Sequence, residues 1–369
     1  MGLIRILLAI AVVAAHSNSI LGFTFTNGTI AVQSFFIISG FYMSLILNEK
    51  YVGVNNSYKL FITNRILRLY PTYFIVLIVA ILISVISFFI DGNAYYLKPY
   101  IDTIKYISPF TLTILILMNL SMLGQDTVMF MGLNKTNGHL FFTMDYSHTD
   151  PFLYLFLFVP QAWVIGIQLM FYLIAPFIVK RRSYILVLIL ILSLVLRFFL
   201  YFFGYYHDPW THRFFPFELA FFAVGGLSYK MYKYMQKIKF NEKYKQIAFF
   251  CILFYIFTFQ FIPIMYEIKQ WVFYLMMVFS IPFIFDLTKK SNFDKLLGDL
   301  SYPIYISHHF IVVILFSILG KNIKFEKFLG LISLVITIII SFVILKFVIN
   351  PIEKIRQKRV INQKVEGQA

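Results

Sequence analysis

The stretch WVIGIQLMFYLIAPFIVKRRSYILVLILILSLVLRFFLYFF, residues 163–203, holds two apolar runs on either side of the basic cluster KRR at 180–182. Each run is close to 20 residues long, the length that an α-helix needs to cross a hydrocarbon core of about 30 Å. Lys and Arg concentrate in the short cytoplasmic loops of helical membrane proteins. The stretch therefore predicts two transmembrane helices joined by a short cytoplasmic loop.

The same pattern continues along the whole chain of 369 residues. Hydrophobic residues make up 60% of it and charged residues only 13%, a composition that excludes an ordinary soluble domain. The short alternating segments of a transmembrane β-barrel are absent. We predict an all-α, polytopic transmembrane helix bundle of about ten spans, at about 3–22, 30–48, 72–90, 162–179, 184–203, 214–234, 246–264, 270–287, 302–319 and 328–349.

Basic residues set the orientation of these spans. With the N-terminus in the cytoplasm, 23 of the 32 Lys and Arg residues fall in cytoplasmic segments, as the positive-inside rule requires. That rule explains the net charge of +16 without a nucleic-acid partner. A full crossing by the apolar segment 106–123 would put every later basic cluster outside. We therefore interpret it as a re-entrant or interfacial helix, with both termini cytoplasmic.

Domain organisation is simple. We assign residues 1–350 to one membrane domain and 351–369 to a short basic cytoplasmic tail. The first apolar run lacks a convincing cleavage site and is interpreted as a retained span. The polar segment 124–151 is expected outside the cytoplasm, with a role that the sequence leaves open. Cys251 is the only cysteine, and no cluster of His, Cys or Asp forms a ligand set, so we expect no metal.

His16 lies in the first apolar run, about three turns beyond Arg5. Ionisable side chains inside a span are costly and are candidates for function. A neutral imidazole can take a proton from a hydroxyl group, which contributes roughly 10²–10⁴ in rate. The alternative is a histidine that only packs between helices, bonded to a neighbouring hydroxyl or carbonyl.

Arg65 and Arg68 stand three residues apart in RILRLYP, so they share a face if the segment is helical. Guanidinium groups recognise phosphate through two parallel hydrogen bonds. The pair would thus suit the phosphates of a cytoplasmic nucleotide or coenzyme. In the alternative interpretation they are interfacial anchors of a membrane helix. Pro71 is expected in the first turn of the next helix, where its missing N–H costs nothing.

Other polar positions fall inside apolar runs. Ser39 and Gly40 form a small step in FFIISGF, which permits close approach of another helix. Gln168 is a buried amide that could bond a ligand or join two helices. Arg213 and Glu218 stand at the outer mouth of a span, where Glu218 needs a partner. His308 is adjacent to His309, so the two rings cannot face the same way.

Taken in order, these motifs resemble the acyltransferase-3 family of integral membrane O-acyltransferases, most of which O-acetylate bacterial surface carbohydrates. The resemblance covers nearly the whole chain. It rests on the His of the first span, FFIISGF, RILRLYP, W-x4-Q-x2-FY at 163–172, R-x3-FE at 213–218 and LGDLSYPIYISHH near the end. About ten spans also agree with the family's architecture.

The resemblance implies transfer of an acyl group, with acetyl as the default, from cytoplasmic acyl-CoA to a hydroxyl of a cell-surface or lipid-linked carbohydrate, such as lipopolysaccharide O-antigen. It implies the bacterial inner membrane, no permanently bound cofactor, and His16 as the residue that transfers the proton. Arg65 and Arg68 would hold the phosphates of the coenzyme. We assign seven residues to the acceptor site or its pocket: Ser39, Gln168, Tyr172, Arg213, Glu218, Tyr302 and His308.

The sequence departs from the family at Gln168, where many relatives carry a glutamate. An amide cannot act as a base, so His16 lacks an obvious carboxylate to orient it, unless the fold brings Glu218 close. An alternative function is a transporter or flippase for a glycolipid or polysaccharide, without acyl-transfer chemistry. Expected partners are membrane lipids, acyl-CoA and the carbohydrate acceptor, with a homo-oligomer or a polysaccharide-assembly complex as a further option.

Overall fold

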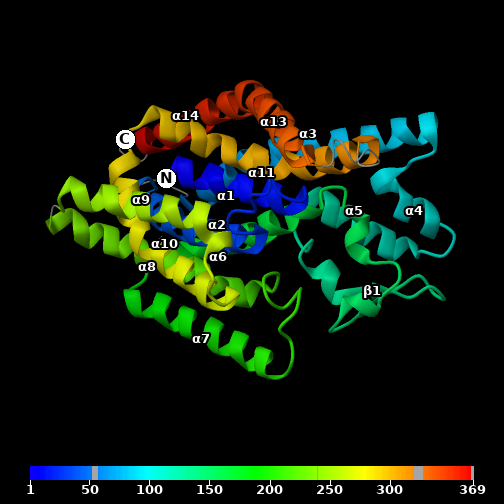
Figure 1. Cartoon of the computed structure of the whole chain (residues 1–369), viewed down its shortest axis with the longest axis horizontal. Helices are drawn as coiled ribbons and strands as arrows, with labels where there is room; N and C mark the ends of the chain where they lie inside the picture. Colours follow the sequence, from blue (N-terminus) through cyan, green and yellow to red (C-terminus); the bar gives the residue numbers. More distant parts are fainter. Residues whose placement is uncertain (52–56, 239, 320–326, 367–369) are drawn as a thin grey trace.

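The computed structural model describes residues 1–51, 57–238, 240–319 and 327–366. Within these ranges the chain is a bundle of helices that run roughly alongside one another (Figure 1). The helices are α1 (Gly2–His16), α2 (Gly28–Glu49), α3 (Ser57–Asp91), α4 (Lys98–Thr103), α5 (Pro109–Ser121), α6 (Trp163–Ile178), α7 (Ser183–Phe202), α8 (Phe215–Ile238), α9 (Glu242–Thr258), α10 (Tyr266–Thr288), α11 (Asn292–Leu319), α13 (Leu329–Ile344) and α14 (Asn350–Glu366).

The predicted all-α transmembrane bundle is confirmed. In the described part of the chain, eight helical segments are long and apolar enough to cross a membrane. They match eight of the ten predicted spans, and α1 and α8 correspond to the other two. Helix α1 packs extensively on α11, and α8 on α2, so both belong to the same bundle. The protein is therefore a multi-pass membrane protein.

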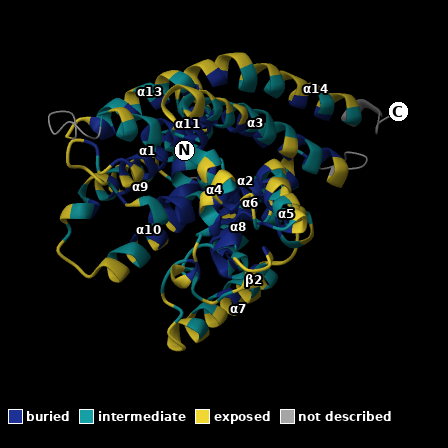
Figure 2. Ribbon diagram, turned by 90° about the vertical axis from the view of Figure 1, so that its right-hand side faces the viewer, coloured by how far each residue is buried: buried dark blue, intermediate teal, exposed yellow. Residues whose placement is uncertain are grey.

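Large apolar side chains cover the outer surface of the bundle. Helix α7 lies at its edge (Figure 1) and exposes Leu188, Leu192 and Phe199 by 49–59%. Figure 2 shows the buried residues gathered along the inner helices α2, α6 and α8. In water such a surface would drive association, whereas lipid tails accept it. The exposed apolar face is the surface expected of a helix in contact with lipid.

Two glycines bring α2 and α8 together. A Cβ atom on Gly40 would collide with the backbone carbonyl of Phe222, and one on Gly225 with that of Ile37. Small residues let helix backbones approach closely where there is no hydrophobic driving force between helices. The Ser-Gly step of FFIISGF thus has the packing role predicted for it.

Three boundaries differ from the prediction. Helix α1 ends at His16 rather than near residue 22, because Asn18 and Ser19 take positive φ angles of 57° and 80°, which an α-helix cannot contain. Helix α3 continues through Pro71, so the expected helix start at that proline is wrong. Helix α11 begins ten residues before the predicted 302. In both long helices, burial against neighbours outweighs the local cost of an internal proline.

The segment 106–123 forms the short helix α5, whose 13 residues span only about 20 Å. This length agrees with the predicted re-entrant or interfacial helix. Ser108 caps its first turn by accepting a hydrogen bond from the backbone N–H of Thr111. The polar segment that follows folds into short helical turns and a small antiparallel sheet, β1 (Met131–Leu133) with β2 (Leu140–Phe142), which the sequence did not predict.

The basic segment after residue 350 forms α14, which follows α13 through a π-helical turn at Leu345–Ile349. Helix α14 packs against α3. Arg356 is buried and donates a hydrogen bond from Nε to the backbone carbonyl of Asn64, at 2.8 Å. Arg359 donates to the side-chain oxygen of the same asparagine, at 3.1 Å. These bonds fix α14 beside the start of α3.

Candidate active site

Two cavities lie one behind the other inside the bundle. We call the first the arginine cavity, because Arg5, Arg65 and Arg68 line it; its volume is about 350 Å³. The second, the histidine cavity, has a volume of about 660 Å³ and is lined by His16 and His309. Four helices contribute residues to the walls of both cavities, namely α1, α2, α6 and α11.

Helix α11 gives the order along this axis. Lys295, Asp299 and Tyr302 line the arginine cavity, and His309 and Val313 line the histidine cavity. At 1.5 Å per residue, Lys295 and His309 are about 21 Å apart along the helix. The two cavities together therefore traverse much of the thickness of a bilayer core.

Arg65 is a buried guanidinium that has no counter-ion among the residues that the structure describes. Its exposed fraction is 3%, and its Nε has no hydrogen-bond partner among the described residues. It forms no ion pair within the described ranges. The rings of Phe61 and Tyr172 lie 5.5 and 6.0 Å from its Cζ atom. A buried charge is costly unless it is paired, so this position favours an anionic ligand.

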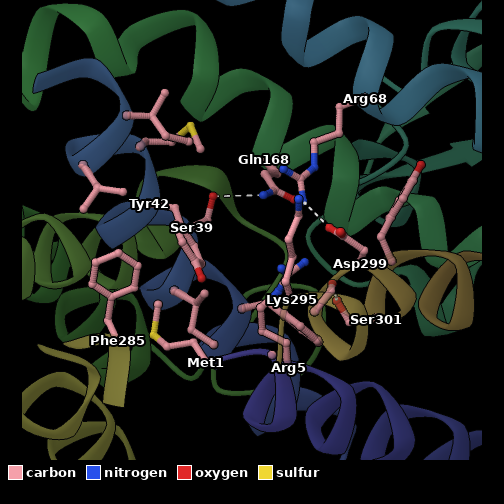
Figure 3. A pocket seen from close by; sticks show the side chains of 18 of the residues that line it. Met1, Arg5, Ser39, Tyr42, Arg68, Gln168, Phe285, Lys295, Asp299 and Ser301 are labelled. Carbon is pink, nitrogen blue, oxygen red and sulfur yellow. Dashed lines mark hydrogen bonds and ion pairs between the residues drawn. The ribbon is translucent and has the colours of Figure 1, made fainter. Parts of the chain in front are cut away.

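Arg68 lines the same cavity one turn further along α3, as the spacing predicted. It is one-third exposed, and one of its terminal nitrogens lies 4.0 Å from Asp299. Figure 3 shows Arg5, Arg68 and Lys295 reaching into the cavity from different helices. Arg5 lines the cavity as well, although no site role was predicted for it. The cavity therefore offers several cations to one ligand.

A third cavity of about 360 Å³ adjoins the arginine cavity and shares Arg68 and Lys295 with it. Helix α14 contributes Glu353, Lys354 and Arg356 to its wall. The basic segment at the end of the chain thus lies next to the arginine cavity.

The predicted pocket residues Ser39, Gln168 and Tyr172 meet in one cluster in the wall of the arginine cavity. Gln168 donates a hydrogen bond from Nε2 to the hydroxyl of Ser39, at 2.9 Å, and this contact is drawn in Figure 3. The same nitrogen contacts the hydroxyl of Tyr172. Tyr302, also predicted, lines the cavity and donates to the carbonyl of Leu69, at 2.8 Å. Gln168 acts here as a connector between α6 and α2.

His16 ends α1 and lines the histidine cavity. Its Nδ1 lies 2.9 Å from the backbone carbonyl of Val12. A carbonyl oxygen only accepts hydrogen bonds, so Nδ1 carries the proton. Nε2 is then the nitrogen with a free lone pair and can act as a base. A backbone carbonyl therefore orients the ring in place of a carboxylate.

His308 supports this arrangement from α11. Its Nδ1 donates to the carbonyl of Tyr305, at 2.6 Å, which leaves Nε2 as an acceptor 3.4 Å from Nδ1 of His16. The neighbouring His309 has its ring centre 5.7 Å from that of His16 and contacts the hydroxyl of Tyr96 through Nδ1, at 2.9 Å. His308 is fully buried, while His309 lines the cavity, so the two rings face different surroundings, as expected.

Arg213 lines the histidine cavity beside Asp208. Its Nε donates to both carboxylate oxygens of Asp208, at 2.9 and 3.1 Å, and its guanidinium lies 4.3 Å from the ring centre of Trp163. His212 contributes a further imidazole to this wall. Burial lowers the pKa of His212 to about 4, so this ring is neutral at pH 7. The wall combines aromatic rings with hydrogen-bonding groups.

Glu218 lines neither cavity. It is fully buried and receives hydrogen bonds from Arg197, at 2.8 Å, and from Gln33, at 3.1 Å. Its partners therefore lie in α7 and α2. Among the described residues Glu218 has no contact with His16, so it does not orient that ring. Arg197 was not predicted as a site residue, although an arginine inside a predicted span meets the same criterion that identified His16.

Comparison with known families matches residues 1–349 to the acyltransferase domain of the acyltransferase-3 family. The chain belongs to this family. The match includes every described residue that lines the arginine cavity or the histidine cavity. Family membership implies acyltransferase activity and an acyl donor. Comparisons with curated proteins and with solved structures gave no match.

Proposed function

We propose that the protein transfers an acetyl group from acetyl-CoA to a hydroxyl group of a cell-surface or lipid-linked carbohydrate. The observation that supports this most directly is Arg65, which is buried in the wall of the arginine cavity and has no ion-pair partner within the described ranges. A pyrophosphate-bearing donor supplies the anion that this guanidinium lacks. The arginine cavity faces the cytoplasm in this proposal, in accord with the positive-inside rule.

The depth of the cavities suits the length of the coenzyme. Arg5 lines the arginine cavity and His16 the histidine cavity. Eleven residues of α1 separate them, or about 16 Å. An extended pantetheine arm has a comparable length. With the phosphates at the arginines, the thioester therefore reaches the boundary between the two cavities, near His16.

The histidine cavity receives the acceptor. Its wall offers Trp163, Tyr146 and Tyr154, together with Asp208 and Arg213. Aromatic faces and hydrogen-bonding groups in a shared pocket suit a ligand that has an apolar ring face and hydroxyl groups. We propose that the carbohydrate enters here from the side opposite the cytoplasm.

The reaction is an acyl exchange between sulfur and oxygen. The acceptor oxygen attacks the thioester carbon while Nε2 of His16 takes the hydroxyl proton. The new C–O bond forms, the C–S bond breaks, and the proton passes from His16 to the thiolate to give free coenzyme A. The carbonyl of Val12 and the ring of His308 hold His16 in the tautomer that this step requires.

The test uses the full chain in lipid nanodiscs with acetyl-CoA that carries a labelled acetyl group. We expect binding of acetyl-CoA, and transfer of label to lipid-linked carbohydrate extracted from bacterial membranes. Arg65→Ala should weaken binding, whereas the exposed Arg181→Ala, in the loop before α7, is the matched control and should not.

The outcomes separate the candidate functions. Binding without any transfer to carbohydrate would contradict the proposed acceptor. Uptake of labelled glycolipid into vesicles, without covalent label, would favour a flippase. We further propose that the protein resides in the bacterial inner membrane with both termini in the cytoplasm, which accessibility of introduced cysteines to a membrane-impermeant reagent would test.

A further inference from the structure

Tyr305 stands at the boundary between the two cavities. Among the described residues it is the only one that lines both of them. It follows Asp299 and Tyr302 along α11, and His309 comes one turn later. The ring of Tyr305 therefore lies at the inner end of the arginine cavity, on its boundary with the space that His16 faces.

The side chain of Tyr305 is firmly held. Its hydroxyl donates a hydrogen bond to the backbone carbonyl of Gln161, at 2.9 Å, and the side chain of Gln161 donates back to the carbonyl of Ile306, at 2.6 Å. Its ring lies against Phe35 and His308, with ring centres 6.2 and 5.9 Å away. Only 4% of Tyr305 is exposed, so neighbours on three sides fix the position of the ring.

We propose that Tyr305 determines which acyl groups the enzyme accepts, because its ring limits the depth that the arginine cavity offers to the acyl chain. This inference rests on the proposed function, in which the phosphates lie at the arginines and the thioester lies deepest. The acyl group is then the part of the donor that meets the ring of Tyr305. An acetyl group ends there, whereas a longer chain has to displace a ring that is bonded to Gln161.

The size of the effect follows from how pockets discriminate chain length. One additional methylene group changes discrimination by roughly 10- to 200-fold in a well-packed site. Removal of the ring widens the passage between the two cavities at the one residue that, in the described part of the chain, lines both. The longer chain then extends into the histidine cavity, which has the larger volume, about 660 Å³.

The experiment measures binding, so it needs no acceptor. Full-length protein in nanodiscs is loaded with labelled acetyl-CoA, which is displaced by unlabelled acetyl-, butyryl- or hexanoyl-CoA. For Tyr305→Ala we expect the affinity for hexanoyl-CoA, relative to acetyl-CoA, to rise at least 10-fold. Tyr305→Phe keeps the ring and should leave the ratio unchanged. Tyr305→Trp should lower the relative affinity for butyryl-CoA.

Tyr302→Ala is the matched control, because it removes the same ring one turn nearer the arginines. An unchanged ratio in a folded Tyr305→Ala protein would overturn the inference, and so would an equal rise in Tyr302→Ala. If Tyr305→Ala does not fold, Tyr305→Trp still tests the inference, because the larger ring should lower the affinity for butyryl-CoA relative to acetyl-CoA, and an unchanged ratio would overturn it. Failure of the wild-type protein to bind any acyl-CoA would instead contradict the proposed function.

Discussion

The arginine cavity and the histidine cavity differ in how they carry charge. Basic side chains outnumber carboxylates in the wall of the arginine cavity, where Arg5, Arg65, Arg68, Lys289 and Lys295 face Asp294 and Asp299. The histidine cavity holds one arginine and one carboxylate, which pair with each other. Its remaining polar wall is made of imidazole, amide, phenol and hydroxyl groups, together with the indole of Trp163.

This difference indicates two ligands of unlike chemistry. An excess of basic side chains around one cavity, with Arg65 among them buried, favours an anionic ligand, and a phosphate-bearing coenzyme provides several negative charges. A wall of paired charges and neutral groups has no such need and suits hydroxyl groups. An enzyme that joins a charged donor to a carbohydrate therefore benefits from keeping the two ligands in separate cavities, with the reacting atoms at the boundary.

Of the predicted effects, the loss of acetyl transfer in His16→Ala should be the largest. It tests most directly whether the histidine cavity serves the chemistry and the arginine cavity serves donor binding. We expect His16→Ala to slow acetyl transfer roughly 10²–10⁴-fold, because it removes the base. Affinity for acetyl-CoA should stay unchanged, since His16 lines the other cavity. Transfer and binding are measured on the same nanodisc sample. His139→Ala, an exposed histidine in the turn between β1 and β2, is the control, and full transfer activity in a folded His16→Ala protein would remove His16 from the chemistry.

Asp126 lies in the polar segment after α5 and lines neither cavity, and it gives a prediction on pH-dependent stability. It is 3% exposed, and burial raises its pKa from 3.8 to about 6. Ionisation of the folded protein is therefore unfavourable, so wild-type stability falls as the pH rises from about 4 to 6 and then levels off. We expect Asp126→Asn to be neutral at pH 3.5 and to stabilise by up to about 3 kcal/mol at pH 8.

Thermal unfolding of both proteins between pH 3.5 and 8 measures this difference. Asp102→Asn, an exposed carboxylate in α4, serves as the control. A gap in Tm that does not grow between pH 4 and 6 would contradict the raised pKa of Asp126.

Substitution of the two arginines of α3 tests which of them contributes more to binding of acetyl-CoA in the arginine cavity. Arg65→Ala should weaken acetyl-CoA binding by about 1.5–3 kcal/mol, the range for hydrogen bonds to charged groups. Arg68→Ala should have the smaller effect, because Arg68 is one-third exposed and lies near Asp299. Equilibrium binding measures both. A larger loss for Arg68 than for Arg65 would reverse the assignment of the main phosphate ligand.

Of the substitutions considered, Gln168→Ala should have the smallest effect. Gln168→Ala removes the hydrogen bond to Ser39 and should lower the free energy of unfolding by about 1 kcal/mol. Because an amide does not titrate, the pH profile of transfer should keep its shape. Thermal unfolding and a pH series of initial rates check this. A shift of the profile would show that Gln168 influences the proton transfer.

Local sequence patterns predicted much of the bundle. Hydropathy located the spans because a helix in lipid satisfies its own backbone hydrogen bonds and needs only an apolar stretch of the right length. The spacing of Arg65 and Arg68 predicted their shared face for a similarly local reason. The same logic failed at Pro71, because packing along α3 outweighs what the proline costs.

Contacts between residues that are distant in the sequence could not be predicted from local patterns. His16 and His308 are 292 residues apart and meet only because α1 packs on α11. Glu218 was expected to need a partner, yet nothing in its neighbourhood identified Arg197. The carbonyl of Val12 as the group that orients His16 carries no side-chain signal at all.

The sequence by itself determined the membrane bundle, its apolar surface and the residues with unusual polarity, because hydropathy and helical spacing act over a few turns of one chain segment. Only the tertiary structure decided which of those residues are neutralised and which remain available. Arg197 pairs with Glu218, while Nε of Arg65 has no hydrogen-bond partner in the described part of the chain. Pairing depends on which helices pack together, and that choice is made by the whole bundle.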